Sequence, residues 1–99
     1  MNETEKERLK KSINESIDGV NEKIEGLKQR RSELSDQMKG ELDKRIRDLE
    51  EKRRELLARS SEFGHAAGEA ARSLGDGLKG AAKELERGVS TAWKEFTQK

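Results

Sequence analysis

The chain of 99 residues contains no cysteine, no proline and no tyrosine, and it has a single histidine. The lack of cysteine excludes disulfides, thiolate metal sites and cysteine nucleophiles. Aromatic residues make up only 3% and hydrophobic residues 29% of the chain, whereas charged residues make up 43%. Such a composition argues against a compact globule with a large core of its own.

No apolar run approaches the roughly 18–20 residues that a membrane span needs, and no hydrophobic segment follows the charged N-terminal stretch. We therefore expect a cytoplasmic protein. The net charge is +1, because 22 basic residues nearly cancel 21 acidic ones. The charge balance provides no general field to attract nucleic acid, so no nucleic-acid partner is expected.

High charge and low hydrophobicity are also typical of disordered chains, but those chains usually contain proline and carry a strong net charge. The sequence has neither feature. Its apolar residues recur at helical spacing, so the sequence predicts an all-α fold built from long helices.

A heptad pattern runs through the first part of the chain. From Ile13 to Leu27 the large apolar residues follow one another at spacings of four, three, four and three, and Leu34 comes seven residues later. β-Branched residues at the a positions and leucine at most d positions favour two-stranded coiled coils. We therefore predict a coiled-coil segment over residues 3–59, and a homo-oligomer.

The heptad register slips near Met38–Leu42, where the apolar residues are four apart, as in a stutter. A continuous helix over residues 3–59 would be about 85 Å long. A helical hairpin at Gly40 is the alternative, because glycine weakens a helix interior. Arg31 and Arg53 fall at a positions, where we expect arginine to set the register and the number of helices rather than to bind anions.

The composition changes after residue 60, where seven of the eight alanines and all aromatic residues lie. Residues 60–63 offer capping serines and are interpreted as a hinge. The alternative is a helix that runs through this segment with only a change of pitch. Over residues 64–97 we predict an amphipathic helix made of three eleven-residue repeats, 64–74, 75–85 and 86–96, which would form a straight apolar stripe. Its many glycines suggest that this helix becomes ordered only against a partner or a membrane.

The sequence lacks the residues of a catalytic or cofactor site. His65 has Glu62 and Glu69 nearby on the same helical face, but one imidazole with two solvated carboxylates is a weak metal-ligand set. We therefore expect no enzymatic activity, no metal and no cofactor.

The function predicted from these patterns is that of a non-enzymatic structural or assembly protein. It would self-associate through its coiled coil and pack its C-terminal helix on another copy or on a protein partner. The alternatives are a peripheral membrane protein that binds lipid through the C-terminal helix, and a stress-protective chain that folds on binding. The residues expected to form the self-association seam are Ile13, Ile17, Val20, Ile24, Leu27, Leu34, Leu42, Ile46, Leu49 and Leu56. The face expected to meet a partner or a membrane consists of Leu74, Leu78, Leu85, Val89, Trp93 and Phe96.

Overall fold

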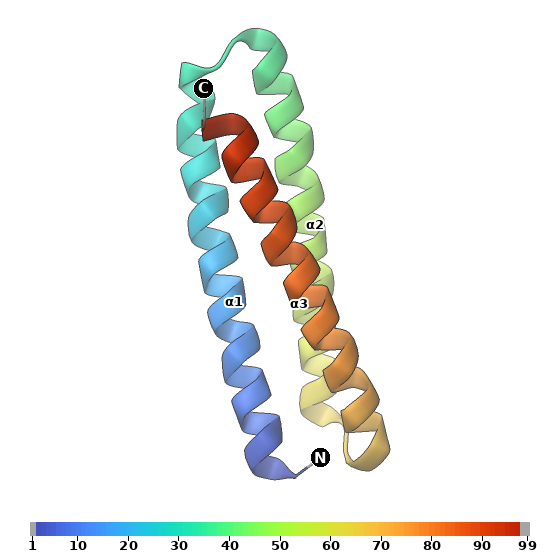
Figure 1. Ribbon diagram of the computed structural model, residues 1–99. Helices are drawn as coiled ribbons and strands as arrows, with labels where there is room; N and C mark the ends of the chain where they lie inside the picture. Colours follow the sequence, from blue (N-terminus) through green and yellow to red (C-terminus); the bar gives the residue numbers. More distant parts are fainter. Residues whose placement is uncertain (1, 98–99) are drawn as a thin grey trace.

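The first helix, α1 (Glu3–Arg30), follows directly from the apolar spacing of the N-terminal segment (Figure 1). It is seen in a computed structural model that describes residues 2–97. The side chain of Asn2 caps the helix by accepting a hydrogen bond of 2.8 Å from the backbone N–H of Glu5. Glutamates lie in its first turn and basic residues in its last turn, where each sign of charge complements the helix dipole.

The chain reverses between Arg31 and Ser35, and the expected continuous helix over residues 3–59 is therefore wrong. A short 3₁₀ helix, η1 (Arg31–Glu33), ends α1, and the backbone is extended at Leu34 and Ser35. Ser35 then caps the next helix by accepting a hydrogen bond of 3.3 Å from the N–H of Met38. Gly40 is not the site of the reversal, because it lies inside that next helix.

The second helix, α2 (Asp36–His65), runs without a break through residues 60–63, so the predicted hinge is also wrong. Ser60 lies one helical turn beyond the buried Leu56 and is itself partly buried, and Phe63 is fully buried. The packing of Phe63 keeps this segment helical, although serine is a weak helix former. The helix ends at His65, and the N–H of the next residue, Ala66, donates to the carbonyl of Phe63.

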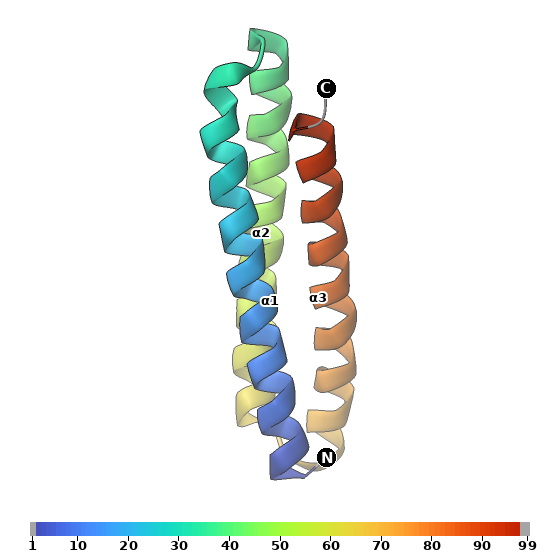
Figure 2. The same cartoon turned by 60° about the vertical axis from the view of Figure 1, so that its left-hand side comes forward.

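The third helix, α3 (Gly68–Thr97), returns beside the other two. Two views of the structure show α1 and α3 running in the same direction, with α2 antiparallel to both (Figures 1 and 2). The bundle measures 51 × 17 × 15 Å. Residues 2–97 contain no strand, so the expected all-α fold is confirmed for this part of the chain.

A single hydrophobic core extends along the bundle, contrary to the expectation that the composition would not allow one. A thin, long bundle achieves this because each helix needs only a narrow apolar stripe. The fully or nearly fully buried residues are Leu9, Ile13, Ile17, Val20, Ile24, Leu27, Leu42, Ile46, Leu49, Leu56, Phe63, Ala71, Leu78, Ala82, Leu85, Val89, Ala92 and Phe96.

The eleven-residue period of the last segment is not confirmed. The buried residues of α3 begin at Ala71 and end at Phe96, and they alternate at spacings of four and three along the whole helix. An eleven-residue repeat would give equivalent positions equal exposure. However, Ala70 is exposed, Ala81 is partly buried and Ala92 is fully buried. The apolar stripe therefore has a period of about 3.5 residues.

Glycine substitutions in α3 test this description of the helix. A Cβ atom built on Gly77 or Gly80 meets no other atom within 4 Å, so alanine at either position should raise the free energy of unfolding by about 0.5–1 kcal/mol. Gly68 has φ of 60°, which costs a residue with a side chain about 1 kcal/mol or more. Gly68→Ala should therefore be destabilising. Urea unfolding followed by circular dichroism gives the three values, and a stabilised Gly68→Ala variant would contradict the start of α3.

Candidate interaction surface

The ten residues expected to form an intermolecular seam lie inside one chain. Nine of them are buried between α1, α2 and α3, and Leu34 is partly buried beside the α1–α2 turn. The pattern of apolar residues does not distinguish helices of one chain from helices of two. In the structure, α2 and α3 occupy the place that the sequence analysis had assigned to a second copy.

The six residues expected to meet a partner or a membrane are also part of this core. Leu78, Leu85, Val89 and Phe96 are buried, and Leu74 and Trp93 are partly buried against the same cluster. The apolar face of α3 therefore packs on α1 and α2. Within residues 2–97, Leu57 is the only large hydrophobic residue that is exposed to solvent, with 46% of its surface accessible.

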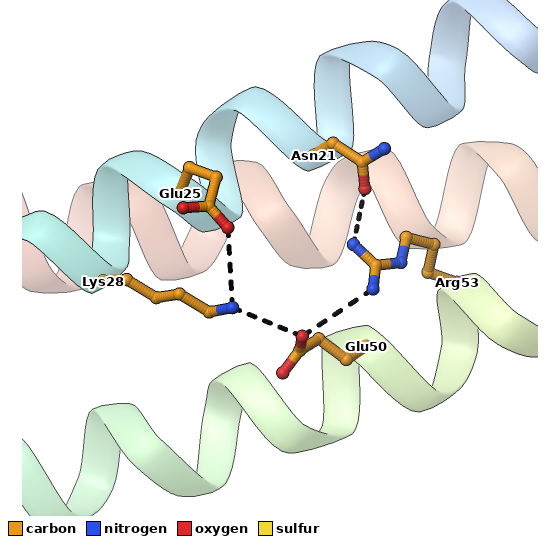
Figure 3. Close-up of polar contacts among 5 residues, drawn as sticks. All are labelled: Asn21, Glu25, Lys28, Glu50 and Arg53. Atoms are coloured by element: carbon orange, nitrogen blue, oxygen red, sulfur yellow. Dashed lines mark hydrogen bonds and ion pairs between the residues drawn. The ribbon is translucent and has the colours of Figure 1, made fainter.

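A polar network crosses the α1–α2 seam near its middle (Figure 3). Arg53 occupies a core-facing position of α2, and its guanidinium leaves the core to donate to the side-chain oxygen of Asn21 on α1. A second guanidinium nitrogen lies 3.7 Å from Glu50, and Lys28 of α1 lies 3.5 Å from the same carboxylate. Lys28 also pairs with Glu25. Each contact is partly solvated and contributes little energy alone, but together they favour one alignment of α1 on α2.

Arg31 forms a second link between these helices, next to the turn. Its Nε and one terminal nitrogen donate to the two carboxylate oxygens of Asp43, at 2.9 and 3.1 Å. This hydrogen-bonded pair lowers the pKa of Asp43 from its ordinary value, and the nearby positive charge of Arg31 acts in the same direction. The same hydrogen bonds, together with the charge of Asp43, raise the pKa of Arg31. Arg31 thus helps to stabilise the turn between α1 and α2.

The lowered pKa of Asp43 predicts an acid-dependent contribution to stability. Because the folded state favours the ionised carboxylate, the contribution is fully present above the unfolded pKa, near 4, and is lost as the pH falls through the lower folded pKa. Asp43→Asn should lower the urea midpoint at pH 7 and lower it less at pH 2. Asp48→Asn is the matched control, because Asp48 forms no ion pair within residues 2–97. Equal shifts for Asp43→Asn at both pH values would contradict this role.

Contacts between α1 and α3 include one that the sequence analysis missed. A Cβ atom built on Gly26 would lie 2.6 Å from Cζ3 and 2.9 Å from Cη2 of Trp93, so the indole ring rests directly on the glycine backbone. The Nζ atom of Lys23 lies 6.0 Å from the ring centroid on the same side. Nearer the bundle centre, Ser16 donates a hydrogen bond to Glu86. In the sequence, the only feature that pointed to the position of the Trp93 ring was a glycine inside a helix with a clear heptad pattern.

The described residues offer little for chemistry. Residues 2–97 contain no group of three or more histidine, cysteine, aspartate or glutamate residues placed to hold a metal ion, and this includes His65 and its neighbouring glutamates. No buried polar or charged residue lies in this part of the chain. One open groove follows the seam between α1 and α3 and is lined by Ser16, Val20, Val89 and Ser90 among others. The arrangement is suited to packing helices against each other.

Comparisons with known proteins do not add to this description. Within residues 2–97, no helix combines the length and the apolar character that crossing a membrane requires. Each of the three helices carries as many basic as acidic residues, so none of them has a net charge. Comparison of the chain with protein-family models, with curated proteins and with solved structures gives no match.

Proposed function

We propose that the chain is a non-enzymatic structural or assembly protein that associates with another copy of itself, or with a protein partner, through coiled-coil-type contacts between helices. The observation that carries this proposal is the regular spacing of the buried residues. In α1 from Ile13 onward, in α2 from Leu42 onward and along all of α3, core-facing positions alternate at spacings of three and four residues. This spacing is typical of coiled-coil contacts, which form between helices of separate chains as well as within one chain.

The outer faces of the helices support the same proposal. They carry charges of both signs, and most are free of large apolar side chains. Within residues 2–97, acidic and basic residues are mixed along each helix, whereas binding to a phosphate backbone calls for a basic stripe. Helix packing is therefore the activity for which the described residues are best suited.

Sedimentation equilibrium over a wide concentration range, with far-ultraviolet circular dichroism on the same samples, tests the proposal. A helical species whose mass rises with concentration supports self-association. A fully helical monomer at every concentration contradicts self-association and leaves a different protein as the partner. A monomer of low helicity supports instead the alternative in which the chain folds only on binding.

Peripheral membrane binding is the second candidate, because α3 has fewer charged residues than α1 or α2 and carries Trp93 near its C-terminal end. Lipid would have to displace α1 and α2 from the apolar face of α3, since that face is buried in the bundle. The only tryptophan of the chain reports on this exchange. A blue shift of its emission on addition of vesicles supports lipid binding, and no shift with either zwitterionic or anionic vesicles contradicts it.

A further inference from the structure

We propose that the α1–α2 turn opens into a continuous helix, so that α1 of one copy packs into the bundle of a second copy. This inference rests on the self-association proposed above and specifies its geometry. The occupant of the groove between α2 and α3 would be α1 of the other copy. The contacts that α1 makes in one chain would then form between two chains.

The turn itself is the first observation. Arg30 and Arg31 have helical backbone angles, whereas Leu34 and Ser35 have ψ of 159° and 162°. Rotation at these two residues is enough to bring α1 and α2 into line. Residues 27–39 contain neither glycine nor proline, so this segment lacks the two strongest helix breakers. The α2–α3 turn differs, because Gly68 adopts φ of 60°, which a continuous helix does not use.

The apolar pattern across the turn is the second observation. Leu34 lies seven residues after the buried Leu27, and Met38 lies four residues before the buried Leu42. Both Leu34 and Met38 are only partly buried in the single chain. In a continuous helix they would extend the apolar stripe through residues 31–35, where the two long helices of a dimer cross. The exchanged dimer would therefore cover apolar surface that the single chain leaves partly open.

The position of the turn is the third observation. In both views the α1–α2 turn extends beyond the C-terminal end of α3 (Figures 1 and 2). The third helix therefore does not cover the segment that would straighten. Along the rest of α1, the polar links to α2 connect side chains on the two facing helices, so they form equally well between two copies (Figure 3).

Two substitutions at the turn should shift the equilibrium in opposite directions. Asp36 is the first residue of α2, a position that accepts proline, and Ser35 before it already has the extended backbone that precedes proline. Asp36→Pro should keep the closed hairpin but place proline inside the continuous helix, so the dimerisation constant should fall more than tenfold. Ser35→Ala removes the cap of α2 and favours helix through the turn, so the constant should rise about tenfold.

Cross-linking distinguishes exchange from other modes of association. Lys28→Cys and Glu50→Cys introduce the only two cysteines of the chain at side chains that face each other, with Lys28 Nζ and Glu50 Oε2 now 3.5 Å apart. A short bismaleimide should join them within one chain in the closed form. In the exchanged dimer it should join two chains and give a covalent dimer on a denaturing gel. Small-angle scattering of the dimer should give a maximum dimension near 95 Å, the length of a continuous helix over residues 3–65, compared with 51 Å for the closed bundle.

The outcomes separate this inference from the proposed function. A long dimer that gives covalent dimers and is suppressed by Asp36→Pro supports exchange. A dimer that gives only intrachain cross-links and is unaffected by Asp36→Pro overturns exchange but leaves self-association intact. A monomer at every concentration, including for Ser35→Ala and after refolding from urea at high protein concentration, overturns both. Circular dichroism of each variant verifies that it is folded.

Discussion

Replacement of Phe63 by alanine is expected to lower the free energy of unfolding by about 3–5 kcal/mol. Phe63 is the largest of the fully buried side chains and has no exposed surface. It lies near the end of α2, where the Nζ atom of Lys6 sits 5.8 Å from its ring centroid and donates to the carbonyl of Ala66. Truncation of the ring would remove the apolar contacts that hold the end of α2 to the start of α1.

Urea unfolding monitored by circular dichroism measures this effect. Leu57→Ala is the matched control on the same helix, because Leu57 is 46% exposed and its truncation should cost less than about 1 kcal/mol. A loss above about 3 kcal/mol is a large part of the total stability of a chain of this size. Phe63→Leu, with an expected loss of about 1–2 kcal/mol, leaves enough folded protein for its free energy of unfolding to be measured. Equal losses for Phe63→Ala and Leu57→Ala would contradict the burial of Phe63.

The all-α class and the apolar stripe from Ile13 to Leu27 follow from the spacing of large side chains, which is a local property. The residues that pack against that stripe lie far from it in the sequence. The same spacing serves a helix of another copy and a helix of the same chain, so the sequence could not show that α2 and α3 would bury α1.

The position of the turn was missed for a different physical reason. Glycine and proline are the usual sequence signals of a turn, so the alternative prediction placed a helical hairpin at Gly40. The chain instead turns at Leu34 and Ser35 with ordinary backbone angles, and the main signal is a capping serine followed by Asp36. A serine of this kind also occurs at Ser60 and Ser61, where the helix continues because Phe63 is held in the core.

In α3, small residues concealed the true period. Ala71, Ala82 and Ala92 are buried, as is Gly75, but Ala70 is exposed. Alanine and glycine occur both in the core and on the surface, so their positions fit an eleven-residue alignment as readily as a seven-residue one. Only the large side chains distinguish the two, and the large buried ones, Leu78, Leu85, Val89 and Phe96, follow one another at intervals of seven, four and seven.

The contact between Gly26 and Trp93 leads to the second large expected effect. Alanine in place of glycine in the middle of a helix normally adds about 1 kcal/mol of stability. At Gly26 the new Cβ would lie 2.6 Å from Cζ3 of Trp93, so the ring must leave its position. The loss of a packed indole face costs more than the helix gains, and Gly26→Ala should lower the free energy of unfolding by about 1–2 kcal/mol.

A double-mutant cycle isolates this contact. Gly19→Ala is the control on α1, because a Cβ there meets nothing within 4 Å and should stabilise the helix by about 1 kcal/mol. In a Trp93→Ala background the obstacle is gone, so Gly26→Ala should become stabilising by a similar amount. The coupling energy between the two positions should then be about 2–3 kcal/mol, within the range for residues in direct contact.

The lone tryptophan gives a second measurement for the same pair. Gly26→Ala should shift the emission of Trp93 to longer wavelength as the ring moves toward water, whereas Gly19→Ala should leave the emission unchanged. If Gly26→Ala stabilises the wild-type chain as much as Gly19→Ala does, Trp93 does not rest on α1. In that case the buried residues Leu85, Val89, Ala92 and Phe96 hold the C-terminal half of α3 in the bundle without a contribution from the ring.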